Sequence, residues 1–381
     1  MTAPIVVDSM QIINAVDERR KLSETRALDV SLNELADMYN STELTIRPEY
    51  QRLFRWSKAK QSQFIESLLL EMPIPPIFAM EIEEGKWELI DGLQRLSTYL
   101  HFRGELDAPE LNPPIKKGDK LELEECDIVK ELNGLTYDDL PTALQIRLKR
   151  CFLRVELVRK ETNPHFRYYM FKRLNTGGEI LSDQEVRNCT IRLLGEEFNN
   201  FIVGLCGNKA FQECIDPLSE ESSRKMGDVE LVLRFFAFKN NFDEFRHDVS
   251  DFMTNFMERV SDPTHEHHIP FNYSTEQLLF EKTFVLLQRT LGPNTCQRWL
   301  GNRYGGQFLM HHFEAISLGI AKVINYIDLN DASQVARTNN ALQTIKQDEE
   351  FRRLTTGGGQ NSPGPYREKI AFVTDKVRSA L

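Results

Sequence analysis

Hydrophobic and polar residues follow two different periods along this chain, and the change from one to the other divides it. Short apolar runs bounded by turn residues predict strands: ELTI at 43–46, IFAMEI and WELID on either side of the turn EEGK, and CFLRVELV at 151–158 as a buried strand. Apolar residues recurring every three to four positions predict helices between them, one running from Ser57 to about Met72. Beyond about residue 190 only the helical period remains.

Start and stop signals set the limits of several predicted helices. Ser31 with Glu34, and Ser182 with Glu185, have the spacing of a capping box, in which each residue satisfies a backbone amide at the helix start. The prolines of PIPP at 73–76 end the helix before them, because proline has no amide donor and restrains the residue that precedes it. The sequence therefore predicts where these helices begin or end.

The remaining segments fit the same division. LPTALQIRLKR and PHFRYYMFKRL are predicted helices, and the second ends in the glycine-rich turn NTGG. Residues 104–133 are polar and acidic, which favours an irregular excursion, and TTGGGQNSPGP at 355–365 has the composition of a loop. We expect an α+β protein: a mixed α/β N-terminal domain over 1–190, with its core at about 28–190, followed by an all-helical C-terminal domain over 191–381.

Composition narrows the functional classes. The 381 residues carry a net charge of −10, so non-specific binding to a nucleic-acid backbone would have to come from a local basic patch. No apolar run approaches the ~20 residues of a membrane span, and the N-terminus lacks the pattern of a signal peptide, so we expect a cytoplasmic protein without a membrane partner. Six cysteines without CxxC spacing are expected as small buried side chains in a reducing compartment: Cys126, Cys151, Cys189, Cys206, Cys214 and Cys296.

The stretch WELIDGLQRLSTYL predicts a strand that passes at Asp91-Gly92 into a helix reaching about Phe102. A helix start exposes unpaired amides, glycine allows close approach to the backbone, and Arg95 supplies a fork of donors suited to phosphate. Asp91 could hold a divalent metal, orient water or accept a proton. Taken alone, however, aspartate and glycine at this point are more typical of an ordinary capped helix.

Two further segments carry donors that suit a phosphorylated ligand. In RPEYQRLFRW, arginines alternate with aromatic residues, a pattern that fits phosphate contacts with base stacking and equally a solvated loop anchored by its aromatics. In FKRLNTGGEILSDQEVRN, the NTGG turn offers amide and hydroxyl groups that could close over phosphates, although such a turn is also a routine helix stop. HEHH at 265–268 resembles a metal cluster, but we expect these histidines in a solvent-facing loop.

In chain order, five segments together resemble one known family: YQRLFRW, IESLLLEMPIPPIF, WELIDGLQRLSTYLHF, FKRLNTGGEILSDQEVRN and DVELVLRFFAF. They are similar to the N-terminal domain of the GmrSD-type modification-dependent restriction enzymes, a domain marked by a DGQQR motif and placed in the ParB/sulfiredoxin-like superfamily. The resemblance covers about residues 40–260. It implies nucleoside-triphosphate binding and, in several members, hydrolysis coupled to DNA cleavage or other defence against phages.

The resemblance also implies roles for individual residues. Asp91, Gly92, Gln94 and Arg95 match the DGQQR motif, and the following residues match its flanking segments: Gln51, Arg52, Arg55, Arg173, Asn175 and Thr176. We expect nucleotide binding by these residues, with Asp91, Arg95 and Asn175 catalytic and Asp91 also the ligand of Mg²⁺ or Mn²⁺. The motif's first glutamine is Leu93 here, and an apolar side chain cannot hydrogen-bond a phosphate or water. A nuclease module of the HNH type is not recognisable in 191–381.

Three functions follow from these expectations. The first is an NTP-binding and NTP-hydrolysing protein of a prokaryotic anti-phage or restriction-type system, acting on or with DNA. The second is a non-catalytic, nucleotide-responsive module that regulates a partner effector, which Leu93 and the acidic charge favour. The third is direct nicking of DNA. A homo-oligomer is compatible with each, and neither the base of the nucleotide nor the trigger can be inferred from the sequence.

Overall fold

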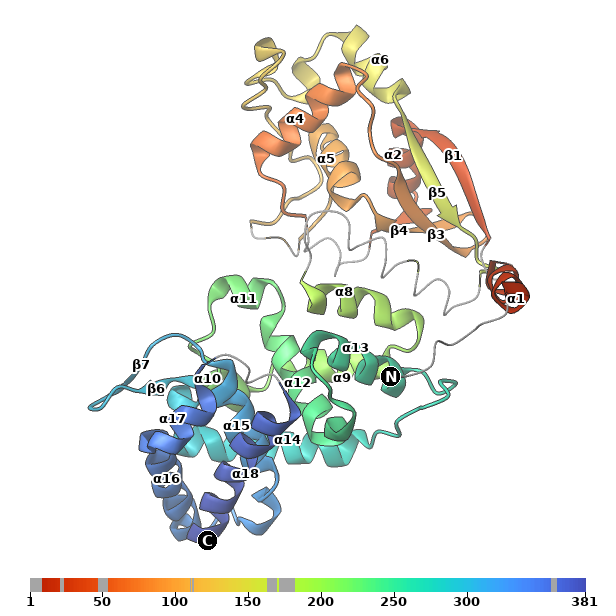
Figure 1. Cartoon of the computed structure of the whole chain (residues 1–381). Coiled ribbons are helices and arrows are strands. Elements are labelled where there is room, and N and C mark those ends of the chain that lie inside the picture. The colour runs from red at the N-terminus through yellow and green to blue at the C-terminus, as the bar shows by residue number, and fades with distance from the viewer. Residues whose placement is uncertain are drawn as a thin grey trace. The chain divides into compact units, whose positions relative to one another are not determined.

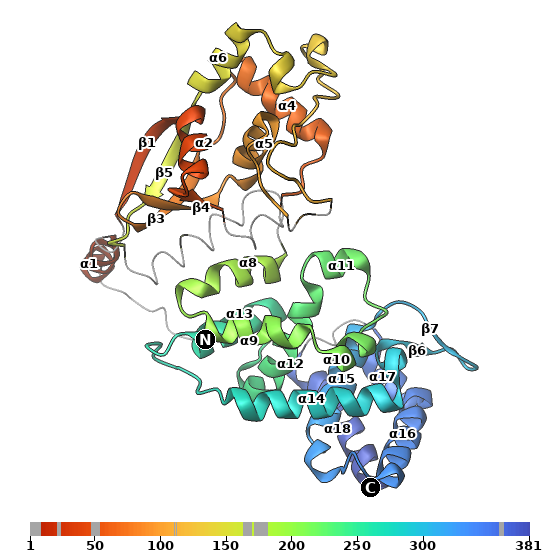
Figure 2. The same cartoon turned by 180° about the vertical axis from the view of Figure 1, so that it is seen from behind.

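The chain forms two compact units, Met1–Gly177 and Gly178–Leu381, in the computed structural model, whose elements Figures 1 and 2 show from opposite sides. The structure describes residues 9–20, 24–46, 54–109, 111, 113–162, 170, 182–357 and 362–381. A mixed sheet lies in the first unit, whereas the described residues of the second are mainly helical. The predicted fold class, mixed α/β followed by helices, is confirmed.

The described part of the first unit is built on a five-stranded sheet with the order β1-β5-β3-β4-β2. β1 pairs antiparallel with β5, β5 parallel with β3, β3 antiparallel with β4, and β4 parallel with β2. The elements are α1 Ser9–Arg20, β1 Thr25–Ser31, α2 Leu32–Asn40, β2 Leu44–Thr45, α4 Lys58–Leu69, β3 Ile77–Glu83, β4 Lys86–Asp91, α5 Leu93–Arg103, α6 Thr142–Arg150 and β5 Phe152–Val158. Short 3₁₀ turns lie at Lys130–Leu132 and Tyr137–Asp139.

The predicted hairpin IFAMEI–EEGK–WELID is present as β3 and β4. α4 packs against α5 and α6 beside the sheet (Figure 1), and the core contains Leu96, Tyr99 and Leu100 of α5. The predicted buried strand is present as β5, with Leu153, Val155, Leu157 and Val158 buried. Near its start the pattern alternates, so that Phe152 is 66% exposed on the outer face.

The helix starts predicted from serine are confirmed. The hydroxyls of Ser31 and Ser57 accept hydrogen bonds from the third amides of α2 and α4. Ser182 and Glu185 form a complete capping box at the start of α8. Local side-chain chemistry therefore decides these positions.

The second unit is a bundle of helices with one short two-stranded ribbon, β6 with β7, among its described residues. Its elements are α8 Asp183–Thr190, α9 Glu197–Cys206, α10 Lys209–Cys214, α11 Glu220–Arg224, α12 Gly227–Asn241, α13 Val249–Ser261, α14 Tyr273–Thr290, β6 Arg298–Trp299, β7 Tyr304–Gly305, α15 Met310–Ala321, α16 Ala332–Gln347, α17 Glu349–Thr355 and α18 Pro363–Ala380. Short 3₁₀ turns lie at Ile191–Leu193, Phe242–Glu244, Gly292–Cys296 and Ile324–Tyr326.

Phenylalanines form the core of this bundle. Phe235 of α12 and Phe280 and Phe284 of α14 are fully buried, and their rings meet one another at centroid distances of 4.5–5.8 Å. Offset and edge-to-face contacts of this kind add to the free energy gained by burying the rings. The apolar helical periodicity beyond residue 190 thus corresponds to a packed aromatic core.

A cluster of buried charges crosses the same bundle. Glu314 on α15 accepts from Arg234 of α12 at 2.7 Å and from Lys369 of α18, and the side chains of Glu314 and Lys369 are 1% and 0% exposed. Burial alone would raise the pKa of Glu314, but His311, Arg234 and Lys369 hold it well below its usual value. A buried carboxylate with this many partners stays charged.

Another buried basic side chain, Lys346, lies between α15 and α16. Lys346 donates its three ammonium hydrogens to the carbonyls of Thr295 and Gln297, both at 2.7 Å, and to Nδ1 of His312 at 2.9 Å. Burial lowers the pKa of Lys346 to about 7, and burial together with this ammonium lowers the pKa of His312 to about 2. His312 is therefore a neutral core residue.

In the described parts of the chain, the helices are too short or too polar to cross a lipid bilayer. The cysteines at 126, 151, 206, 214 and 296 are free thiols, and all but Cys151 are buried. Burial raises the pKa of Cys126 to about 11 and that of Cys214 to about 12, so neither thiol is activated as a nucleophile.

Candidate functional site

The junction of β4 and α5 depends on Gly92. Its φ of +98° is a left-handed conformation that side chains rarely adopt. A Cβ at this position would also lie 2.2 Å from Cγ2 of Ile77 on β3. Glycine is therefore required to pack the turn against the neighbouring strand, in addition to any approach by a ligand.

Asp91 ends β4, and its carboxylate pairs with Arg95 one helical turn later. Nη2 of Arg95 lies 3.0 Å from Oδ2 of Asp91 and also donates to the carbonyl of Pro76 at 3.1 Å. The two side chains are 34% and 18% exposed, so solvent still reaches both. Nε of Arg95 is buried and has no hydrogen-bond partner among the described residues. The ion pair thus has a defined geometry, but one donor of Arg95 has no hydrogen-bond partner among the described residues.

Asp91 does not cap α5. The N-cap residue is Gly92, and no side chain caps the helix. The reading of this stretch as an ordinary aspartate-capped helix is therefore wrong, because Asp91 belongs to the strand and uses its carboxylate for Arg95. The first turn of α5 therefore has no capping carboxylate.

Gln94 joins two segments that are far apart in the sequence. Its Oε1 accepts hydrogen bonds from the amides of Arg55 and Trp56, both at 3.1 Å. From α4, Nε2 of Gln61 donates to the carbonyl of Trp56 at 2.8 Å, while its Oε1 lies 2.9 Å from Nδ1 of His101 on α5. Two glutamines thus fix the backbone that carries Arg55 next to the DGLQR turn.

The aromatic residues of this segment pack against the protein. Phe54 is buried and meets His101 edge-on, and Trp56 packs against Phe64 with the Lys60 ammonium 5.0 Å from its ring. Phe54 consequently acts as an anchor and does not present a face to a base. The side chain of Arg55 is exposed, and Leu93 is half-buried.

The structure brings five of the predicted site residues together: Asp91, Gly92, Gln94, Arg95 and Arg55. The other five lie outside the described residues: Gln51, Arg52, Arg173, Asn175 and Thr176. Within the described ranges, no group of three or more His, Cys, Asp or Glu side chains has the geometry of a metal site. A divalent ion would thus have to combine Asp91 with oxygens from a ligand or from water.

Sequence reasoning missed several positioning groups. The carbonyl of Pro76 holds Arg95, and Gln61 holds the Trp56 carbonyl, yet the sequence shows only a proline run and a polar helix residue at these places. The burial of Glu88 on β4 was also not predicted: this residue is only 5% exposed. In the sequence, Glu88 stands between the apolar residues Trp87 and Leu89, and this position within a predicted strand was the available indication.

Comparison with protein families identifies the segment that carries this site. Residues 32–192 match the model of the GmrSD restriction endonuclease, N-terminal domain. Residues 32–192 are therefore similar to a GmrSD N-terminal domain. No curated protein and no solved structure gives a match. The resemblance expected from the sequence is thereby confirmed over these residues.

The match covers less than half of the chain but includes every predicted site residue from Gln51 to Thr176. It extends beyond the first compact unit, because its last helix, α8, is part of the second. Arg187 of α8 is buried there, bonded to Glu230 at 3.0 Å and to the hydroxyls of Ser250 and Thr254. The family's sequence limits and the compact units are therefore different divisions of this chain.

Proposed function

We propose that the GmrSD N-terminal domain of this chain binds a nucleoside triphosphate at the β4–α5 junction and hydrolyses it. The observation that carries the proposal is the Asp91–Arg95 pair at the uncapped start of α5, next to the backbone of Arg55 held by Gln94. An acid, a guanidinium and helix amides at one turn are the groups that phosphate binding and transfer require.

The ion pair would open when nucleotide binds. Asp91 would exchange Arg95 for Mg²⁺ or Mn²⁺, whose remaining positions are filled by phosphate oxygens and water. Arg95, with its unpartnered Nε, would turn its donors to the phosphate chain, where charge develops as the β–γ bond breaks. Arg55, exposed beside the turn, would contact the same phosphates. Water supplies the attacking oxygen, and the products are a diphosphate and inorganic phosphate.

Residues outside the described ranges belong to the same proposal. Asn175 and Thr176 would complete the site from the NTGG turn, and Gln51 and Arg52 from the arginine-rich segment, with Arg173 at the end of the preceding predicted helix. DNA or an effector protein would be the downstream partner of the nucleotide-bound state.

The test is release of phosphate or pyrophosphate from each of the four ribonucleoside triphosphates, with Mg²⁺ or Mn²⁺, with and without DNA. Asp91→Asn and Arg95→Gln are expected to reduce turnover at least 100-fold. Glu83→Gln is the matched control, because Glu83 pairs with Lys86 in the same hairpin and lies at its exposed turn. Wild-type rates in both site variants would remove the catalytic assignment.

One observation favours a second function, a nucleotide-responsive module that binds without turnover. Leu93 replaces the glutamine of the DGQQR motif, and its half-buried apolar side chain cannot orient a water molecule. Calorimetry separates the two functions. Binding that is lost in Arg95→Gln, without any product release by the wild type, supports the module. Nicking of supercoiled plasmid in the same reactions would instead assign the domain a nuclease activity.

A further inference from the structure

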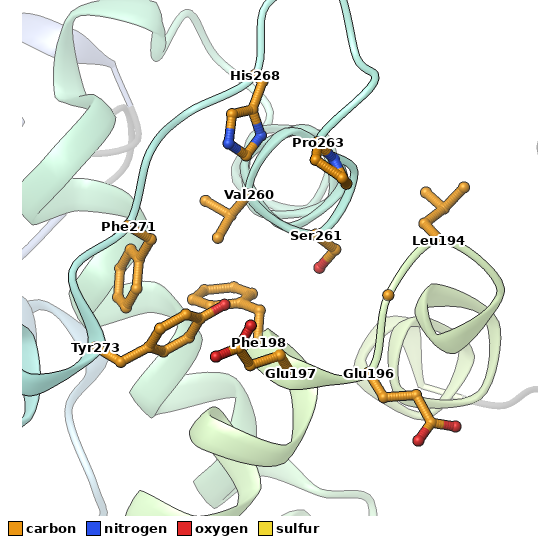
Figure 3. Close-up of a pocket in the computed structure, with 11 residues that line it drawn as sticks. Leu194, Glu196, Glu197, Phe198, Val260, Ser261, Pro263, His268, Phe271 and Tyr273 are labelled. Carbon is orange, nitrogen blue, oxygen red and sulfur yellow. The ribbon is translucent and has the colours of Figure 1, made fainter.

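The second unit contains a pocket to which the family assignment gives no role. Its volume is about 440 Å³, within the roughly 300–1,000 Å³ of small-molecule sites. The start of α9, the end of α13 and the segment leading into α14 form its walls (Figure 3). All of its lining residues lie between Leu194 and Tyr273, and thus within one compact unit.

Aromatic rings form one side of this pocket. Phe198 is fully buried, and its ring centroid lies 5.0 Å from that of Phe271 in an edge-to-face contact. Phe271 in turn meets Tyr273 at 5.2 Å. Figure 3 shows the three rings grouped at one side of the space, with Val260 above Phe198. This wall suits a flat or apolar group of a ligand.

A buried hydroxyl points into the same space. Ser261, at the end of α13, is only 8% exposed, and its Oγ has no hydrogen-bond partner in the described part of the chain. Figure 3 shows this oxygen directed toward the pocket. The oxygen has almost no accessible surface of its own, so it adds a polar group to this wall without being an open hydrogen-bond donor.

The charges around the pocket are negative. Glu196 and Glu197 contribute carboxylates, and none of the lining residues, all of which are described, is a lysine or arginine. Burial, with a smaller contribution from Glu197, raises the pKa of Tyr273 to about 12, so the phenol remains neutral. Nδ1 of His268 is committed to the carbonyls of Arg259 and Asp262 at 2.9 and 3.1 Å. A phosphorylated ligand would meet repulsion here, whereas a cation would be attracted.

We propose that this pocket binds an organic cation, with an amidinium or guanidinium group on Glu197 and an apolar or flat body against Phe271 and Tyr273. A planar cation can donate two parallel hydrogen bonds to a carboxylate and lie over aromatic rings. The same chemistry is available from a free small molecule and from an arginine side chain of a protein partner. The assignment is independent of nucleotide binding at Asp91 and Arg95.

The experiment is calorimetry on the full chain with benzamidine as the probe, beside neutral benzamide and anionic benzoate. Benzamidine is expected to bind at least tenfold more tightly than either. Glu197→Gln should weaken it at least tenfold, and Tyr273→Phe and Ser261→Ala less. Glu220→Gln, an exposed acid on α11 outside the pocket, is the matched control and should leave the affinity unchanged.

Two further measurements complete the test. Thermal unfolding of Glu197→Gln without ligand should match the wild type, which separates lost binding from lost folding. Comparison of benzamidine with a capped arginine amide distinguishes the sources: tighter binding of the capped arginine assigns the site to a protein side chain, and tighter benzamidine to a free cation. The proposal is overturned by equal binding of benzamide, by binding of inorganic phosphate at this site, or by benzamidine affinity that Glu197→Gln leaves unchanged.

Discussion

Two sets of oppositely charged side chains differ in how far solvent reaches them. One is the pair Asp91–Arg95, and the other is Glu314 with Arg234 and Lys369. In the first, the carboxylate has one described charged partner and is 34% exposed. In the second, both carboxylate oxygens are matched by buried cations and the side chain is 1% exposed. Both arginines leave Nε without a described partner, so the difference lies in the carboxylates. An exposed pair can exchange partners, whereas a sealed cluster can only be broken.

The largest expected effect is in the sealed cluster. Glu314→Gln leaves Lys369 buried without its anion and leaves Arg234 with Glu230 alone, so we expect the free energy of unfolding in urea to fall by about 3–5 kcal/mol. Glu350→Gln, which removes an exposed partner of Arg353, serves as the control and should not move the urea midpoint. A loss of stability no greater than in the control would show that the cluster is not sealed.

The next largest loss of stability is expected at Gly92, which follows Asp91 in the turn between β4 and α5. Gly92→Ala combines a positive φ with a collision against Ile77, so we expect a loss of about 2–4 kcal/mol. Gly85→Ala is the matched control: Gly85 also has a positive φ, +76°, but a Cβ there would meet nothing within 4 Å. It should lose only about 1 kcal/mol, from backbone strain. Equal losses in the two variants would contradict the role of Ile77.

A pH dependence of stability should come from the buried region. His312 has a pKa of about 2 in the folded chain, compared with about 6.5 when unfolded, so between these values the unfolded state binds the extra proton. Stability contributed by the neutral ring is complete above pH 6.5 and is lost as the pH falls. Between pH 6.5 and 4.5 the loss is about 2–3 kcal/mol. The check is urea unfolding over this range beside His312→Gln, in which the corresponding slope should disappear.

The smallest effect on stability is expected at the exposed pair itself. Asp91→Asn should change the free energy of unfolding by less than about 1 kcal/mol, because the pair is solvent-accessible and Arg95 keeps its bond to Pro76. The same urea experiment measures it. A loss as large as that of Glu314→Gln would make Asp91 a structural residue and erase the distinction between the two sets of charged side chains.

Local signals in the sequence were sufficient for much of the fold. Ser57 and the Ser182–Glu185 capping box mark helix starts, and the EEGK turn marks a hairpin, because each depends on atoms a few residues apart. β1 and α1 were not predicted. Thr25–Ser31 forms a strand through its pairing with β5, more than 120 residues away, and no local pattern reveals such a partner.

The candidate site was predictable in composition but not in geometry. DGLQR indicated which side chains would gather, whereas the bond from Arg95 to Pro76 and the bonds from Gln94 to two amides depend on how β3, α4 and α5 pack together. The buried partners of Glu314 could likewise not be predicted from the sequence, since Arg234 and Lys369 are 80 and 55 residues away from it. Charge patterns along a helix do not reveal such distant partners.

The bonds made by Gln94 also bear on how this site can change over time. Gln94 accepts hydrogen bonds from the backbone amides of Arg55 and Trp56, and every residue except proline has such an amide. Substitutions at position 55, other than proline, can therefore keep the course of the backbone. If Arg55 binds the ligand as proposed, natural variation and directed mutagenesis can change ligand preference at this position separately from folding.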